Sequence, residues 1–315
     1  MEKNRKVIIT GAAGFIGSHI AEYFYAKDIN VTCYVKKSSS LQNIKNLPVD
    51  IIYGDINDLH SLKETFRGAD FVIHAAAIVK DCGADYNTFY RINVLGTLNV
   101  LKACHENNIK DIIITGSIAS YGEESSFVLK NEESSYNSHH KYFLDSIFPC
   151  KMNYYSDSKA AATKESVKYA GEKGLNLTII ELSWVYGERE FNTGFYEYMK
   201  TVKTKIPLLP GSKKNKFHVI YAGDLARAYY LAFHKRLTGI NRIIVGNRES
   251  DNMNEMYSIF CKELGIRKPY NLPRMFSYPI GFLLELYYTL FHIKSPPLLT
   301  RGRVDMFYNN IEYST

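Results

Sequence analysis

Cysteine is scarce in this chain and irregularly spaced. The 315 residues include five cysteines, and no two of them form a C-x-x-C pair. Scattered thiols in odd number fit neither a disulfide framework nor a zinc site. The N-terminus also lacks the long apolar segment and small-residue cleavage site of an export signal. We therefore expect a protein of a reducing, cytoplasmic compartment that holds no metal.

A concentrated basic tract is missing as well. The net charge is +7, but the cations are spread along the chain, and only Lys36-Lys37 and Lys213 to Lys216 form short clusters. Such clusters are usually solvated surface, and otherwise they suit a small anionic ligand better than a polyanion. We expect a small-molecule substrate and no nucleic-acid partner.

The chain has no internal repeat and no low-complexity linker, and apolar runs instead alternate with helix-length segments. This alternation predicts an α/β fold, a Rossmann-type doubly wound parallel sheet. We expect residues 1–187 to form a dinucleotide-binding domain to which residues of about 217–248 return. Residues 188–315 are expected to form mainly a smaller substrate-binding region. The expected strands are 7–10, 31–35, 49–53, 71–74, 111–115 and 177–182, and the longest expected helices are 85–106 and 154–173.

One C-terminal segment, Phe276 to Ile293, is rich in Leu, Phe and Tyr. Pro279 and Glu285 interrupt it, and it falls short of a membrane span. We favour a buried or lid helix here. The wall of a lipophilic pocket and contact with a membrane surface stay open as alternatives.

A glycine motif follows the first expected strand directly. Gly11, Gly14 and Gly17 open a helix whose first turn contains Phe15 and Ile16. Glycine permits the tight turn and lets backbone N–H groups approach a pyrophosphate at the helix N-terminus. Because strand, turn and helix occur in the required order, the motif predicts dinucleotide binding.

The residues after the second strand bear on which dinucleotide is bound. A ribose-binding Asp or Glu would mark NAD, but the sequence has Lys36, Lys37 and Ser38. Two ammonium groups favour the 2′-phosphate of NADP, with NAD as the alternative. Asp55, after the third strand, is a candidate acceptor for the adenine amino group, or else a turn or helix cap.

A Tyr-x-x-x-Lys pattern occurs four times, and context separates the four. Only Tyr155 and Lys159 begin the helix that precedes the sixth strand, while Thr115-Gly116-Ser117 ends the fifth. A Tyr and a Lys one turn apart share a helix face, so the ammonium can lower the phenol pKa. Tyr155 then becomes a proton donor or acceptor for a carbonyl or alcohol, and Ser117 bonds the same oxygen.

Together with His74 to Ala77, Asn93 to Val100, Val185-Tyr186-Gly187 and Asp224-Leu225-Ala226, these motifs resemble the extended short-chain dehydrogenase/reductase family. This is also called the NAD-dependent epimerase/dehydratase family, and the resemblance covers nearly the entire chain. It implies a Ser117–Tyr155–Lys159 triad in an enzyme, with Lys159 also holding the nicotinamide ribose. Asn93 is implied either in a proton relay or in helix packing. The resemblance also implies a homodimer formed through the helices near 85–106 and 155–173. Other residues expected at the cofactor are Ile56, Ala75, Ala76, Ala77, Thr115 and Leu182.

Two positions bear on the branch of the family. Trp184 stands where nucleotide-sugar epimerases usually carry an Asn that contacts the diphosphate, and Phe217 stands where they tend to carry an Arg. Aromatic side chains in place of phosphate contacts favour a less polar substrate, with Ser117 and Trp184 at its site. The pattern looks more like the branch of 3β-hydroxysteroid dehydrogenases and dihydroflavonol reductases. We therefore expect reduction of a ketone on a hydrophobic or ring-bearing molecule. The alternatives are a nucleotide-sugar epimerase or dehydratase and a non-catalytic NADP-binding regulator.

Two features depart from the family pattern. Glu181-Leu182 stands where the family usually has Arg-Pro, and the segment between Ser117 and Tyr155 is longer than usual. We expect this insertion to shape the substrate pocket. Its adjacent His139 and His140 are interpreted as residues of a solvent-exposed loop rather than as metal ligands.

Overall fold

The core of the protein is one large parallel sheet. The computed structural model describes residues 5–79, 84–191, 194–293, 295 and 297–315. Seven strands pair in the order β12-β7-β5-β4-β1-β2-β3, and every neighbouring pair is parallel. This confirms the predicted α/β fold. The strands are β1 Lys6–Thr10, β2 Asn30–Val35, β3 Asp50–Tyr53, β4 Phe71–His74, β5 Asp111–Thr115, β7 Asn176–Leu182 and β12 Ile240–Val245.

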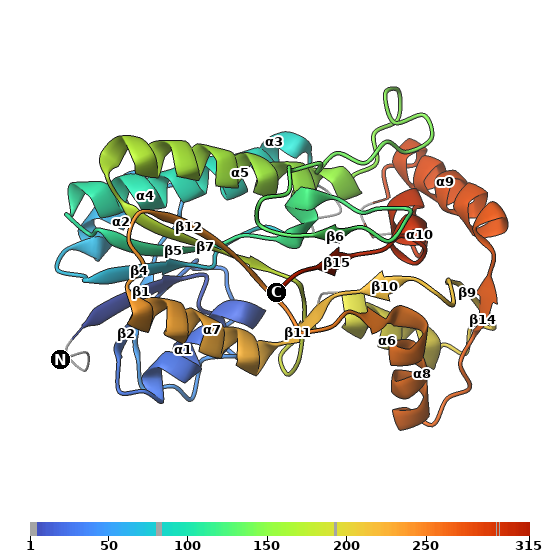
Figure 1. Ribbon diagram of the computed structural model, residues 1–315, viewed down its shortest axis with the longest axis horizontal. Helices are drawn as coiled ribbons and strands as arrows, with labels where there is room; N and C mark the ends of the chain where they lie inside the picture. Colours follow the sequence, from blue (N-terminus) through green and yellow to red (C-terminus); the bar gives the residue numbers. More distant parts are fainter. Residues whose placement is uncertain (1–4, 80–83, 192–193, 294, 296) are drawn as a thin grey trace.

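Helices cover both faces of this sheet (Figure 1). Successive side chains of a strand point to opposite faces, so Val7 and Ile9 pack with Phe24 and Phe233 on one side while Ile8 packs with Leu62 on the other. Burial on both faces explains why the strands read as continuous apolar runs. One face carries α1 Phe15–Tyr25 and α7 Ala222–Lys235, and the other carries α2 Leu59–Phe66, α4 Gly96–Glu106 and α5 Met152–Lys173.

The helix expected over 85–106 contains a wider segment. It begins as α3 (Tyr86–Phe89), continues as the π-helical η1 (Tyr90–Leu95) and ends as α4. A π-helical turn inserts an extra residue and re-aims nearby side chains. Here the segment contains the buried Asn93, whose contacts are described below.

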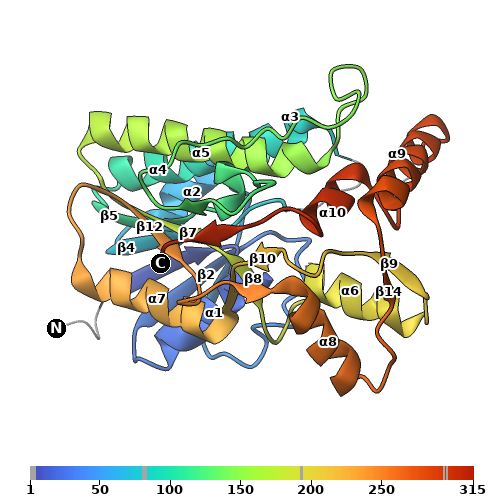
Figure 2. The ribbon, with the colours of Figure 1, turned by 45° about the vertical axis from the view of Figure 1, so that its right-hand side comes forward.

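The C-terminal half adds a second group of elements at the carboxyl ends of the large strands (Figures 1 and 2). A separate core of aromatic side chains, including Phe195, Phe217 and Tyr257, holds it together. The helices are α6 Gly194–Lys203, α8 Met253–Glu263, α9 Arg274–Leu290 and α10 Arg301–Met306. The short strands pair as β8 Trp184–Tyr186 with β11 Val219–Tyr221, β10 Lys216–Phe217 with β13 Asp251–Asn252, β9 Leu208–Pro210 with β14 Tyr270–Leu272, and β15 Glu312–Tyr313 with β6 Leu129–Lys130.

Helix α9 corresponds to the apolar segment singled out in the sequence. It is not a buried helix, because only Ser277, Gly281 and Glu285 are fully enclosed while most of its large apolar side chains face outward. Within the described parts of the chain, no helix combines the length and the apolar character that crossing a membrane requires.

Candidate active site

Three side chains predicted to carry the chemistry meet at the carboxyl end of β5. Ser117 lies two residues beyond β5, where its hydroxyl accepts from Ala119 N and caps the short 3₁₀ helix η2 (Ile118–Tyr121). Tyr155, in the first turn of α5, lies close enough to Ser117 for the Ser117 side chain to lower the pKa of its phenol. One turn later Lys159 donates from Nζ to the Thr115 carbonyl oxygen at 2.5 Å. Helix α5 and β5 therefore position a hydroxyl, a phenol and an ammonium group at one place.

The pKa values of this cluster are set mainly by burial. Burial raises the pKa of the Tyr155 phenol, and the neighbouring Ser117 side chain opposes that rise. The sequence predicted a phenol pKa lowered by Lys159, and the structure differs because loss of hydration outweighs the favourable contacts. Burial likewise lowers the pKa of Lys159 to about 8, against the opposing charge of Glu181. Lys159 therefore titrates close to neutral pH.

The loop between β1 and α1 has the geometry of a pyrophosphate site. Gly11 has φ +72°, and a Cβ there would lie 2.6 Å from the backbone nitrogen of Ala76. A Cβ on Gly17 would lie 2.3 Å from the Gly11 carbonyl oxygen. Gly14 begins α1 without a side-chain cap, and the first turn has no acidic residue. The N–H groups that a helix leaves unpaired at its start are thus open to an anion, and the residues fit a dinucleotide.

Residues predicted around this loop lie at the same edge of the sheet. Phe15 and Ile16, in the first turn of α1, are partly exposed. Ala75 and Ala76 follow β4 and are also partly exposed, while Ala77 is exposed. The Ala75 N–H donates to the Thr10 carbonyl oxygen at 3.1 Å, which keeps the segment after β4 against the end of β1.

The residues predicted to bind the adenosine part of the cofactor differ in exposure and in contacts. Lys36 and Lys37 are exposed after β2, and Lys36 Nζ lies 3.9 Å from Asp55 Oδ2. Asp55 Oδ1 accepts from both the backbone N and the side-chain Nδ2 of Asn57 at 2.9 and 2.8 Å. Asp55 therefore caps a turn, one of the two roles predicted for it. Ile56 is buried, and its contact with Gly96 turns it toward α4.

The residues predicted to lie near the nicotinamide make hydrogen bonds that fix the positions of neighbouring side chains. Thr115 Oγ1 lies 2.7 Å from the Tyr229 hydroxyl, and Leu182 is buried at the end of β7. His74 is hydrogen-bonded by Thr10 on one ring nitrogen and Thr97 on the other, at 2.7 and 2.9 Å. Burial, with the nearby Lys159 charge, lowers the pKa of His74 to about 3, so this ring is neutral at physiological pH.

Asn93 has a positioning role in the structure. Its Oδ1 accepts from Ile78 N at 2.8 Å, and its Nδ2 donates to Ile78 O at 3.0 Å and to Ser158 Oγ at 2.9 Å. The side chain thereby fixes the segment after β4 to α5. Because both polar ends of the amide are engaged, this geometry favours the packing role over the proton relay.

A buried network that the sequence did not predict surrounds Glu181. This fully buried carboxylate accepts hydrogen bonds from the Tyr121 hydroxyl at 2.5 Å and from the Tyr136 hydroxyl. The guanidinium of Arg242 lies 4.5 Å from the Tyr136 ring centre, and its Nε is 3.5 Å from Glu181 Oε1. The sequence signalled only that Glu181 departs from the family pattern. Its partners come from η2, the insertion and β12, which are far apart in the chain.

Two histidines of the insertion between Ser117 and Tyr155 pair with aspartates of the surrounding structure. His139 lies 2.7 Å from Asp157 and 2.9 Å from Asp145, and His140 lies 3.3 Å from Asp305. Hydrogen bonds to Asp157 and Asp305 raise the pKa of His139 and His140, respectively. His139 is exposed, as expected for a solvent-exposed loop, and His140 is partly buried. Both rings are in addition ion-pair partners that hold the loop in place. Among the residues that the structure describes, no group of three His, Cys, Asp or Glu side chains could hold a metal.

Trp184 lies in an aromatic cluster. Its ring centre is 4.8 Å from that of Phe217 and 5.9 Å from that of Phe195, and the indole remains partly exposed. Trp184 and Phe217, at the two positions singled out in the sequence, are thus aromatic rings in tilted contact.

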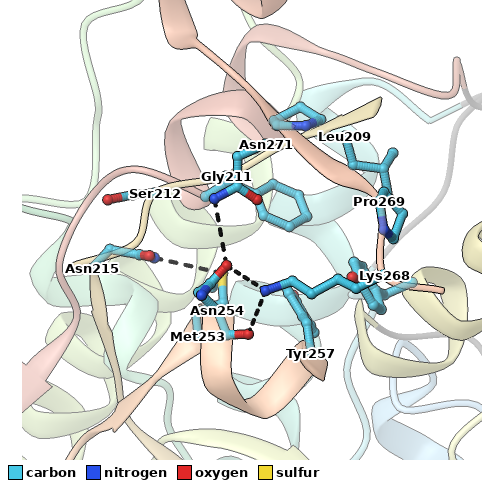
Figure 3. A pocket seen from close by; sticks show the side chains of 13 residues that line it. Leu209, Gly211, Ser212, Asn215, Met253, Asn254, Tyr257, Lys268, Pro269 and Asn271 are labelled. Atoms are coloured by element: carbon cyan, nitrogen blue, oxygen red, sulfur yellow. Dashed lines mark hydrogen bonds between the residues drawn. The ribbon is translucent and has the colours of Figure 1, made fainter. Parts of the chain in front are cut away.

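The cavity drawn in Figure 3 is too small to be the substrate site. It lies between β9, α8 and the segment before β14, with Asn254 and Lys268 on its wall. Its volume is about 10 Å³, which corresponds to roughly one water molecule. The end of β5 therefore stays the candidate site for the chemistry.

The parallel sheet and its glycine loop are those of a dinucleotide-dependent oxidoreductase of the extended short-chain type. The family model described as "NAD dependent epimerase/dehydratase family" matches residues 7–246, and the chain belongs to this family. It is therefore an enzyme whose family typically uses NAD(P).

Individual relatives point to more than one branch. A putative UDP-glucose 4-epimerase of Methanocaldococcus jannaschii is 27% identical over 85% of this chain and 86% of its own. A decarboxylating sterol-4-alpha-carboxylate 3-dehydrogenase of Dictyostelium discoideum is 23% identical over 94% and 89%. The solved structure of Thermus thermophilus UDP-glucose 4-epimerase in complex with NAD is 26% identical, with a TM-score of 0.70 over 85% and 86%. Similarity at this level favours no branch.

Proposed function

We propose that this enzyme reduces a ketone, or oxidises the corresponding alcohol, on a hydrophobic or ring-bearing small molecule. The observation that supports this is the aromatic cluster of Trp184, Phe217 and Phe195. Phe217 and Phe195 are buried, and neither offers a charged or hydrogen-bonding group to a sugar diphosphate. The partly exposed Trp184 is the ring of this cluster that a substrate can reach, and its face suits an apolar ring. The sterol dehydrogenase relative is compatible with such a substrate.

The residues at the end of β5 supply the proton chemistry. The nicotinamide cofactor gives or takes the hydride when it is bound. Tyr155 donates a proton to the substrate oxygen in reduction and accepts it in oxidation. Ser117, which lies beside Tyr155, orients that oxygen. Lys159, charged below about pH 8, stabilises negative charge on the phenol as the proton leaves.

We further propose NADP as the preferred cofactor. Lys36 and Lys37 present exposed ammonium groups directly after β2, where a carboxylate would repel a 2′-phosphate. The opposing consideration is Asp55, 3.9 Å from Lys36, which neutralises part of this charge. NAD is the alternative, since the similar Thermus thermophilus structure contains it.

The alternative function is a nucleotide-sugar epimerase or dehydratase. The Methanocaldococcus jannaschii relative, whose match covers most of both chains, is compatible with this function. In that case the hydride leaves and returns to the same sugar, and no net redox change accompanies turnover.

Titration with NADPH and NADH, followed by nicotinamide absorbance during incubation with ketones and nucleotide sugars, distinguishes the two. Tighter NADPH binding and net NADPH oxidation with a ketone support the reductase. Retained NAD with an isomerised sugar and constant absorbance support the epimerase. Lys36→Ala with Lys37→Ala should weaken NADPH binding and leave NADH binding nearly unchanged if the 2′-phosphate lies there.

A further inference from the structure

Exposed apolar side chains gather at one end of the molecule, on α9 and on the loop of residues 143–147. Both elements lie side by side in two views, with α9 in orange-red and the loop that precedes α5 in green (Figures 1 and 2). We call these side chains the apolar end face. It consists of Phe143, Leu144, Ile147, Met275, Phe276, Ile280, Leu283, Tyr287, Leu290 and Phe291, each more than two-fifths exposed.

The helix cannot rotate to bury this face. Its exposed positions follow the helical spacing of four and three residues, which places them on one side. On the opposite side, a Cβ on Gly281 would lie 2.9 Å from the Thr300 carbonyl carbon, so α9 and α10 are in close contact. Glu285 accepts from Arg301 Nε at 2.6 Å, and Arg301 is fully buried. Turning α9 would break this buried ion pair.

The loop is fixed to the helix in the same way. Arg301 also donates to the carbonyl oxygens of Phe143 and Phe148. The Phe143 ring packs 5.5 Å from the ring of Phe282, and its backbone N–H donates to the Tyr278 hydroxyl at 3.1 Å. Ile147, 80% exposed, therefore projects beside α9 from an anchored loop.

We propose that the apolar end face binds the surface of a lipid membrane. Ile147 and Met275 are 80% and 73% exposed, and side chains that project this far into solvent suit insertion between lipids. Helix α9 lies flat in such an interface, with its apolar side in the acyl boundary. This extends the sequence analysis, which favoured a buried or lid helix and kept membrane contact as an alternative.

The charges around the face are complementary to anionic lipid. Lys141 is exposed beside the loop and supplies a cation. Arg274 at the start of α9 is half exposed and pairs with Asp305 at 2.7 Å. The other carboxylates of this region are also paired, Glu285 with Arg301 and Asp145 with His139. Cations near an anionic leaflet add to the attraction of the apolar side chains.

The test uses the full chain and sedimentation with vesicles of phosphatidylcholine mixed with phosphatidylglycerol. Leu283→Glu and Ile147→Glu place a charge in the apolar end face on two different elements. Ile259→Glu is the matched control, since Ile259 on α8 is 59% exposed and Leu283 is 60% exposed. We expect the wild type and the control to bind, and each face variant to lose about tenfold in partitioning. Binding to pure phosphatidylcholine should be weaker for all proteins that bind.

Three outcomes would overturn this inference. The wild type fails to bind vesicles, or both face variants bind as tightly as Ile259→Glu, or the wild type is a dimer that Leu283→Glu dissociates while no protein binds lipid. The last result would assign the face to a second copy of the chain. Thermal unfolding of each variant, expected to match the wild type because these side chains are exposed, excludes a folding defect. The test is independent of any substrate.

Discussion

Tyr136 in the insertion donates a hydrogen bond to Glu181 at the end of β7, and this joins the insertion to the floor of the candidate active site. Glu181 packs against the segment that carries Ser117, because a Cβ on Gly116 would be 2.8 Å from Glu181 Cγ. Its negative charge also raises the pKa of Lys159 against burial. One buried carboxylate thus contacts the insertion and stabilises the charge of Lys159.

Replacing Glu181 with Gln should destabilise the protein. The substitution removes the charge that accepts two tyrosine hydrogen bonds and pairs with the partly exposed Arg242, which costs roughly 2 kcal/mol in the free energy of unfolding. Denaturant unfolding measures this loss. Glu172→Gln, an exposed position on α5, should change the free energy by less than about 0.5 kcal/mol. Equal stability of the two variants would show that the Glu181 network contributes little.

Replacing Tyr155 with Phe should remove the proton donor and keep the fold. We expect a loss of about 10²-fold or more in turnover, with cofactor affinity nearly unchanged. Tyr169→Phe is the matched control, because Tyr169 and Lys173 repeat the same spacing on α5 away from Ser117. A Tyr155→Phe enzyme as active as the Tyr169→Phe enzyme would exclude the phenol from catalysis.

The rate of reduction should fall as the pH rises through about 8. Lys159 is charged below its lowered pKa of about 8 and loses its proton above it, so its support for negative charge at Tyr155 disappears. Turnover measured from pH 6 to pH 10 tests this. In Lys159→Arg, the guanidinium stays charged across this range. The residual activity of this variant should therefore not fall as the pH rises above 8. A wild-type profile that is flat to pH 10 argues against a titrating Lys159.

Gly11→Ala should abolish cofactor binding. Two effects combine at this position, a φ of +72° and a Cβ that would meet Ala76 N at 2.6 Å. Gly68→Ala separates them, because Gly68 has φ +70° and nothing within 4 Å of its Cβ position. Gly68→Ala should cost only about 1 kcal/mol of stability and leave NADPH binding intact. Isothermal titration of both variants measures the difference, and a Gly11→Ala protein that binds normally contradicts the assignment of the loop.

Patterns local in sequence were the ones that could be predicted. The strands at 71–74 and 111–115 match β4 and β5 residue for residue, because continuous apolar runs mark strands buried on both faces. The spacing of Tyr155 and Lys159 is enough to predict that the two side chains share one face of a helix. The π-helical segment at Tyr90–Leu95 does not, since its extra residue is stabilised by contacts such as that of Asn93 with Ser158.

Features that depend on distant partners could not be predicted. Glu181 meets Tyr136 and Arg242 from segments about 45 and 60 residues away, and no local pattern encodes that meeting. The outward orientation of α9 follows from the Glu285–Arg301 ion pair, in which both residues look like ordinary surface charges in the sequence. Composition indicated an apolar helix, and only the fold shows which side it exposes.

The most direct test of the account is transfer of label from cofactor to product. The enzyme is incubated with NADPH deuterated at the transferable position of the nicotinamide and with a ring-bearing ketone, and the product is analysed by mass spectrometry. The account predicts an alcohol that contains one deuterium at the former carbonyl carbon, formed in step with NADPH oxidation and absent with Tyr155→Phe. Unlabelled ketone, together with a nucleotide sugar that the same enzyme isomerises without net oxidation of cofactor, would contradict it.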